Sequence, residues 1–81
     1  MPLLTGPQLR AARAMARMDQ EALAEAAGIS GNTLRRLEGM EGQLRSTIAT
    51  VQGLQHVLEA AGVEFTNGDA PGVRMRTPTA A

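Results

Sequence analysis

The residue types that this 81-residue chain lacks narrow its possible functions. It has no cysteine, so disulfide bridges and thiolate metal sites are excluded. Its single histidine, His56, cannot build a zinc site alone. Phe65 is its only aromatic residue, which argues against single-strand nucleic-acid binding through stacked bases. We therefore predict no metal and no cofactor, and no small-molecule substrate is evident.

Long apolar runs are also missing. No segment approaches the roughly 20 apolar residues that cross a bilayer. The first residues, MPLLTGPQ, lack the charged start and apolar stretch of a signal peptide. A cytoplasmic protein of one small domain, with no membrane contact, is expected. Neither a glycine-rich phosphate loop nor a nucleophile–base–acid set can be assembled, so we do not expect an enzyme.

The charged residues balance, with eight basic and eight acidic side chains. This zero net charge gives no case for nucleic-acid binding by the chain as a whole. All eight basic residues are arginine, which contacts phosphate and guanine through two hydrogen bonds better than lysine does. Codon usage in a GC-rich genome explains this bias at least as well.

Helix signals begin near the N-terminus. Thr5 and Gln8 fit a capping box for a first helix that runs to about Arg17. Asp19 is a favourable N-cap for a second helix. That helix is expected to end before Gly28, where a left-handed residue is wanted.

A third helix follows almost at once, over residues 30–38. Ser30 is its natural N-cap, and Ile29 can pack on Leu34 as a hydrophobic staple. Leu34 and Leu37 form the stripe that should be buried. The opposite side is polar and carries Asn32, Arg35 and Arg36.

A fourth helix has the strongest amphipathic pattern in the chain. Ser46 or Thr47 caps its start, and Gly62 closes it. Its apolar residues repeat every three or four positions, which predicts one buried stripe. The stripe comprises Ile48, Val51, Leu54, Leu58 and Ala61.

The period then changes to two, which is typical of strands. We predict a short antiparallel hairpin that pairs Val63–Thr66 with Gly72–Arg76, with Pro71 outside the paired part. A lone ribbon is barely stable, so it should pack on the helices, pair with a second chain, or both. Residues 63–76 are thus a candidate dimerisation element, with an apolar interface of Val63, Phe65, Val73 and Met75. Residues 77–81 are expected to be disordered.

Residues 18–41, MDQEALAEAAGISGNTLRRLEGME, resemble the lambda Cro/cI-type helix-turn-helix family, also called the Xre family of regulators. With its flanking helices the resemblance covers residues 4–62, with the helix-turn-helix at 19–38. It implies a mainly α, four-helix Cro/cI-type domain that binds double-stranded DNA, here followed by the hairpin. The shared positions are Gln20, Leu23-Ala24, Gly28-Ile29-Ser30, Leu34 and Leu37-Glu38.

The resemblance also implies roles for single residues. The third helix would lie in the major groove, with Asn32, Thr33 and Arg36 reading bases. Gly31 falls at a reading position but has no side chain, which leaves only its backbone. In the loop 39–46 and just after it, Arg45 and the Thr47 hydroxyl are further candidates for backbone contact, although Glu41 would oppose phosphate. The candidate contacts to the DNA backbone are Gln20, Ser30, Gly31, Arg35, Arg45 and Thr47.

The family pattern includes a buried ion pair between the first and third helices, which maps onto Arg13 and Glu38. Both residues sit at the edges of apolar stripes, so a structural role is expected for them. The function predicted from these features is a homodimeric repressor that reads a palindromic operator. The alternative is a protein-interaction module, or an antitoxin-like protein that binds a partner protein and uses the helix-turn-helix as a scaffold.

Overall fold

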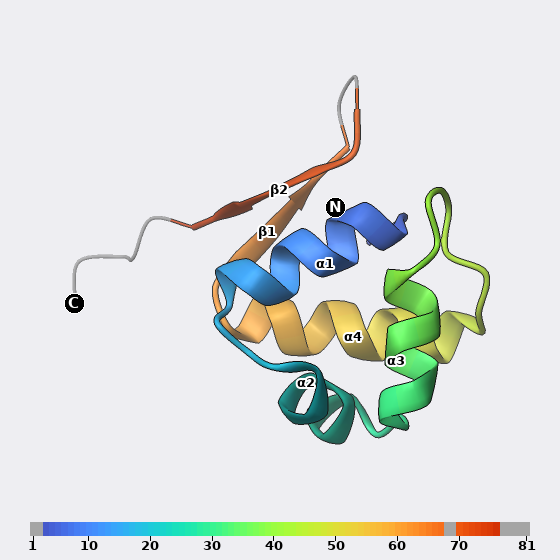
Figure 1. Ribbon diagram of the computed structural model, residues 1–81. Helices are drawn as coiled ribbons and strands as arrows, with labels where there is room; N and C mark the ends of the chain where they lie inside the picture. Colours follow the sequence, from blue (N-terminus) through green and yellow to red (C-terminus); the bar gives the residue numbers. More distant parts are fainter. Residues whose placement is uncertain (1–2, 68–69, 77–81) are drawn as a thin grey trace.

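A computed structural model of the chain describes residues 3–67 and 70–76. Within these ranges four helices precede a two-stranded antiparallel hairpin, which confirms the mainly helical fold predicted from the sequence (Figure 1). The predicted disordered tail, residues 77–81, lies outside the described residues. No helix in the described ranges is long and apolar enough to cross a membrane. The elements are α1 (Gly6–Met15), α2 (Gln20–Ala27), α3 (Gly31–Glu38), α4 (Ile48–Ala60), β1 (Val63–Thr66) and β2 (Gly72–Met75).

Each helix begins at a predicted N-cap. The side-chain oxygen of the cap accepts a hydrogen bond from the backbone N–H three residues later, which satisfies a donor that the helix itself leaves unpaired. At the start of α1 the capping box is complete, because the Gln8 side chain also accepts from the Thr5 backbone. Of the two candidates before α4, Thr47 is the cap. The caps in chain order are Thr5, Asp19, Ser30 and Thr47.

The end of α1 differs from the prediction, because the helix stops at Met15 instead of Arg17. Arg17 has a φ of 58°, a left-handed conformation that side chains other than glycine rarely adopt. The Met18 N–H donates to the Arg13 carbonyl, and the Arg17 N–H donates to the Ala14 carbonyl. These two bonds form a Schellman motif in which arginine occupies the position that usually holds glycine.

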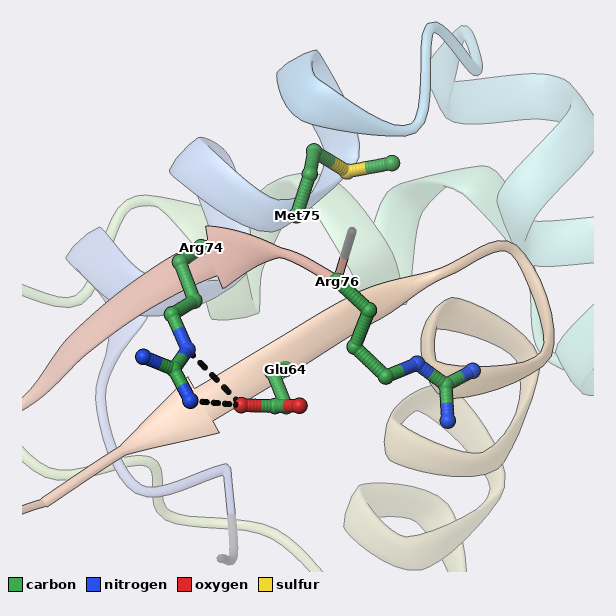
Figure 2. Close-up of a pocket in the computed structure, with 4 residues that line it drawn as sticks. All are labelled: Glu64, Arg74, Met75 and Arg76. Carbon is green, nitrogen blue, oxygen red and sulfur yellow. Dashed lines mark hydrogen bonds and ion pairs between the residues drawn. The ribbon is translucent and has the colours of Figure 1, made fainter. Parts of the chain in front are cut away.

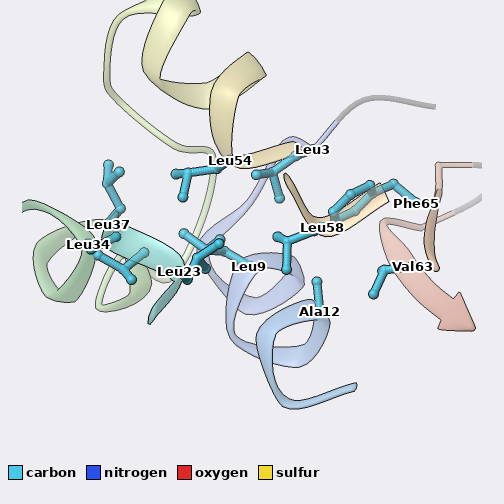
Figure 3. Close-up of a cluster of buried hydrophobic side chains, with 11 residues drawn as sticks. Leu3, Leu9, Ala12, Leu23, Leu34, Leu37, Leu54, Leu58, Val63 and Phe65 are labelled. Carbon is cyan, nitrogen blue, oxygen red and sulfur yellow. The ribbon is translucent and has the colours of Figure 1, made fainter. Parts of the chain in front are cut away.

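The core contains leucines from all four helices together with side chains of β1 (Figure 3). Phe65 of β1 is its largest fully buried side chain. The predicted stripe of α4 needs one correction at each end. Ile48 is 75% exposed because the first turn of α4 projects beyond the core, and Ala61 is exposed just after the last helical residue. The buried apolar residues are Leu3, Leu9, Ala12, Leu23, Ala24, Leu34, Leu37, Leu54, Leu58, Val63 and Phe65.

The hairpin packs on α1 and α4, on the opposite side of the molecule from α3 (Figure 1). Its register pairs Val63 with Met75 and Phe65 with Val73, so these four side chains share one face of the ribbon. Strand β2 is one residue shorter than predicted. The Arg76 N–H nevertheless donates to the Gly62 carbonyl at 2.8 Å, which extends the backbone pairing beyond the strand.

A buried glutamine links the N-terminal segment to the hairpin. The Gln8 side-chain oxygen accepts from the backbone N–H groups of Leu4 and Thr5. Its Nε2 donates to Asn67 Oδ1 and to the Gly72 carbonyl, both at 3.1 Å. All polar atoms of this 3% exposed side chain are therefore paired, as burial requires.

The loop 39–46 folds back on the start of α1. The Gly6 N–H donates to the Gly42 carbonyl at 3.1 Å, and the Leu44 N–H donates to the Leu4 carbonyl at 2.8 Å. Gly6 lies so close to this loop that an added Cβ would overlap the carbonyl oxygen of Met40. The loop is consequently held at a fixed position after the end of α3.

Candidate functional site

Helices α2 and α3 are two eight-residue helices joined by a turn of three residues, Gly28–Ser30. Gly28 has a φ of 73°, so the left-handed end predicted for α2 is confirmed. The Ile29 N–H donates to the Ala24 carbonyl, and the Ser30 side chain starts α3 immediately afterwards. This turn sets the angle at which α3 leaves α2.

The outer face of α3 is polar and open to solvent. Asn32, Arg35 and Arg36 are exposed, and Thr33 is half-buried. Arg35 donates to Asn32 Oδ1 and forms an ion pair of 3.4 Å with Glu21 of α2. Among the described residues the Arg36 side chain forms no hydrogen bond or ion pair, so its guanidinium is free to bind a ligand. The structure thus brings the three predicted base-reading residues, Asn32, Thr33 and Arg36, onto one accessible helix.

The inner face of α3 holds the predicted ion pair. Arg13 Nε lies 2.6 Å from Glu38 Oε2, and Arg13 Nη2 donates to Glu38 Oε1 at 3.1 Å. The Glu38 side chain is 5% exposed and that of Arg13 is 24% exposed. The hydrogen bond to Glu38 raises the pKa of Arg13 above its usual value, with burial acting in the opposite direction. This two-pronged pair fixes α3 against α1.

Gln20 completes this inner cluster, a role that sequence reasoning missed. Its Nε2 donates to Glu38 Oε1 at 3.0 Å, and Arg13 Nη1 donates to the Met18 carbonyl. Arg10 also donates to the backbone carbonyl of Glu38. Glu38 therefore connects α1, α2 and α3 at one point. Projection of a single helix cannot show this, because it contains no information on how α2 is oriented toward α3.

The remaining predicted backbone contacts lie around α3. Ser30 and Gly31 are at its first turn, where backbone N–H groups point outward from the helix end. Arg45 is exposed in the loop that follows α3, and within the described ranges its side chain has no polar partner. The Thr47 hydroxyl both caps α4 and donates to Thr50 Oγ1 at 2.9 Å. Its capping role is independent of any ligand.

The hairpin residues predicted to meet a second chain divide into two groups. Val63 and Phe65 are each 1% exposed inside their own chain, so their side chains cannot meet another chain without unfolding. Val73 is half-buried, and Met75 is 45% exposed. Any contact that the hairpin makes with a second chain therefore rests on Val73, Met75 and the strand backbone.

A hollow beside β2 is lined by Glu64, Arg74, Met75 and Arg76 (Figure 2). Arg74 pairs with Glu64 across the two strands at 2.6 Å, and Arg76 Nη2 donates to the Glu59 carbonyl at 2.9 Å. In Figure 2 Met75 points away from these charged groups, on the other face of the ribbon. The polar groups of the hollow thus already have partners within the chain.

Histidine and acidic residues do not cluster in a way that would hold a metal ion anywhere in residues 3–67 and 70–76. Comparison with models of known protein families gives no match, and comparison with curated proteins gives none either.

Proposed function

We propose that this chain is a sequence-specific regulator that binds double-stranded DNA, a homodimeric repressor of the lambda Cro/cI type. Helices α2 and α3 form its helix-turn-helix, and α3 enters the major groove. The observation that carries the proposal is the division of α3 into two faces. One face is fixed by the buried ion pair between Glu38 and Arg13. The other face presents Asn32 and the unpartnered side chain of Arg36.

The dimensions of α3 suit this role. An α-helix with its side chains is about 10–12 Å across, and the major groove of B-DNA is about 12 Å wide. The three-residue turn that contains Gly28 is typical of helix-turn-helix units. Asn32 would pair with adenine and Arg36 with guanine, each through two hydrogen bonds.

Contacts with DNA phosphates would fix the position of α3 along the major groove. Arg35, the backbone N–H groups at Ser30 and Gly31, and Arg45 are the groups that supply them under this proposal. Gln20 supports the interface less directly than the resemblance implies, because one of its amide hydrogens already binds Glu38. Its second amide hydrogen and its backbone N–H are still available to a phosphate.

Dimerisation would set the spacing of the two recognition helices. Related two-fold dimers read half-sites about 34–36 Å apart, which is one turn of DNA. The open edge of the hairpin, with Met75, is our candidate contact. Because Val63 and Phe65 belong to the core, removal of the hairpin would unfold the chain. The suitable test is Met75→Asp followed by sedimentation: a shift to monomer supports this interface, and an unchanged dimer places it elsewhere.

Selection of binding sites from a random duplex pool tests the DNA proposal. The purified chain should enrich a palindromic motif, and Arg36→Ala and Asn32→Ala should each lose preference at particular bases. Arg74→Ala is a matched control, because it removes the same charge from β2, on the opposite side of the molecule from α3, where Arg74 pairs with Glu64. Absence of any enrichment at low salt, where attraction to phosphate is greatest, would contradict the proposal.

One observation favours a second candidate, a protein-interaction module or an antitoxin-like partner-binding protein. Ile48 is 75% exposed at the start of α4, directly after the loop 39–46. Loss of a protein partner on Ile48→Ser, with DNA binding unchanged, would favour this second function.

A further inference from the structure

Gly31 has no side chain, and the space that a side chain would fill is occupied by Glu21 of α2. A Cβ built on Gly31 would lie 2.8 Å from Glu21 Oε1 and 3.3 Å from Arg35 Nη1. The carboxylate of Glu21 therefore lies over the first turn of α3, where a residue with a side chain would have displaced it. The same carboxylate is 3.4 Å from the guanidinium of Arg35.

Arg35 is held between two acceptors. Glu21 lies on one side, and Asn32 Oδ1 accepts a hydrogen bond on the other. Its side chain is nevertheless half exposed, and that of Glu21 is 79% exposed. Exposed pairs of this kind are weak, so a phosphate can compete with the carboxylate for Arg35.

We propose that Glu21 is a positioning residue that restrains Arg35 and weakens its attraction to DNA phosphate, and that Gly31 leaves room for the carboxylate at this position. The inference rests on the proposed DNA-binding function. A phosphate that binds Arg35 must replace the Glu21 carboxylate, which then remains as an uncompensated negative charge beside the DNA. Attraction that does not depend on base sequence is thereby lowered, while Arg36 is left free to read bases.

Two variants remove the restraint in different ways. Glu21→Gln removes the charge and keeps the shape of the side chain. Gly31→Ala keeps the charge but places a methyl group where the carboxylate lies, so the flexible end of Glu21 must move away. Both should bind a short fluorescent duplex of random sequence about two- to fivefold more tightly at low salt. Glu21→Gln should also make the dependence of log affinity on log salt steeper by about 0.9, as for one further phosphate neutralised, whereas Gly31→Ala, which keeps the carboxylate, should change this dependence less.

Glu25→Gln is the matched control. Glu25 is exposed on the same helix, carries the same charge and has no polar partner in the described parts of the chain. Its substitution should therefore give only the small effect of the altered net charge. The double variant Glu21→Gln/Gly31→Ala gives a second check, because Gly31→Ala should add no affinity once the carboxylate is gone.

The outcomes separate this inference from the function on which it rests. If the chain and all variants fail to bind the duplex at low salt, the DNA-binding proposal is wrong and the inference falls with it. If the chain binds but Glu21→Gln matches Glu25→Gln in affinity and salt dependence, only the role of Glu21 is overturned. Additive effects of the two substitutions would overturn the role assigned to Gly31.

Discussion

The inner and outer faces of α3 each carry an arginine–glutamate pair, and the two pairs differ in geometry and burial. The inner pair, Arg13–Glu38, has an N–O distance of 2.6 Å and side chains that are 24% and 5% exposed. The outer pair, Arg35–Glu21, has a distance of 3.4 Å and side chains that are 50% and 79% exposed. Both join α3 to another helix.

This comparison shows that the surroundings of an ion pair decide its role. The inner carboxylate has little contact with water, so its energy depends on keeping Arg13 and Gln20 as partners. The outer carboxylate is hydrated whether or not Arg35 is nearby, so exchange of partners costs little. One pair is thus suited to fix α3, and the other is suited to respond to a ligand.

The largest expected effect comes from breaking the inner pair on one side. Glu38→Gln should lower the free energy of unfolding by about 3 kcal/mol, at the low end for broken buried pairs because Arg13 is partly exposed. Urea denaturation followed by circular dichroism measures this. Glu21→Gln, which is the same change on the outer face, should alter the free energy of unfolding by less than about 0.5 kcal/mol.

A double variant separates the effect of the two charges from the effect of side-chain packing. Arg13→Met with Glu38→Leu removes both charges, so it should recover much of the stability lost in Glu38→Gln. If the double variant is as unstable as the single one, packing of the two side chains matters more than their charges.

A smaller loss of stability is expected at the contact between Gly6 and the loop that follows α3. Gly6→Ala should lower the free energy of unfolding by about 1–3 kcal/mol, because the added methyl group forces the carbonyl of Met40 to move. Gly42→Ala is the control in the same contact region, since a Cβ there meets nothing within 4 Å. Thermal unfolding of the two variants should separate them clearly, and equal midpoints would contradict the close contact at Gly6.

Local features of this fold could be predicted from the sequence, because they depend on neighbours along the chain. The N-caps at Thr5, Asp19 and Ser30 are examples, as is the left-handed Gly28. The fold class follows from the change of apolar period before Val63.

Features that depend on how elements meet could not be predicted in this way. The exposure of Ile48 depends on where the core ends, and the left-handed Arg17 depends on the Schellman turn that the path into α2 requires. At the candidate site, the polar face of α3 was predictable from periodicity. The contacts of Gln20 with Glu38 and of Glu21 with Arg35 join different helices, so they emerge only from the fold.

Gln20 donates a hydrogen bond to the carboxylate of the inner pair. Gln20→Ala should lower the free energy of unfolding by about 1 kcal/mol, because Glu38 loses one donor but keeps Arg13. The measurement is chemical denaturation, alone and in the Glu38→Gln background. In that background Gln20→Ala should cost less, since the charged acceptor of its hydrogen bond has become a neutral amide oxygen, which accepts a weaker bond. Equal costs in both backgrounds would show that Gln20 acts independently of Glu38.

The smallest effect is expected for the outer pair itself. Arg35→Ala should change the free energy of unfolding by less than about 0.5 kcal/mol, and any change should vanish at high salt, where exposed charges are screened. Unfolding curves at low and high salt check this. A loss as large as that of Glu38→Gln would show that the two faces of α3 do not differ as described.

The link between Gln8 and the hairpin has a consequence for synthesis of the chain on the ribosome. Gln8 emerges long before its amide can find its acceptor on Gly72, which lies 64 residues further along the chain. Phe65, the largest buried side chain, also arrives late. The helices leave the exit tunnel before Val63 and Phe65 do, so leucines of the core stay exposed until the hairpin has also emerged.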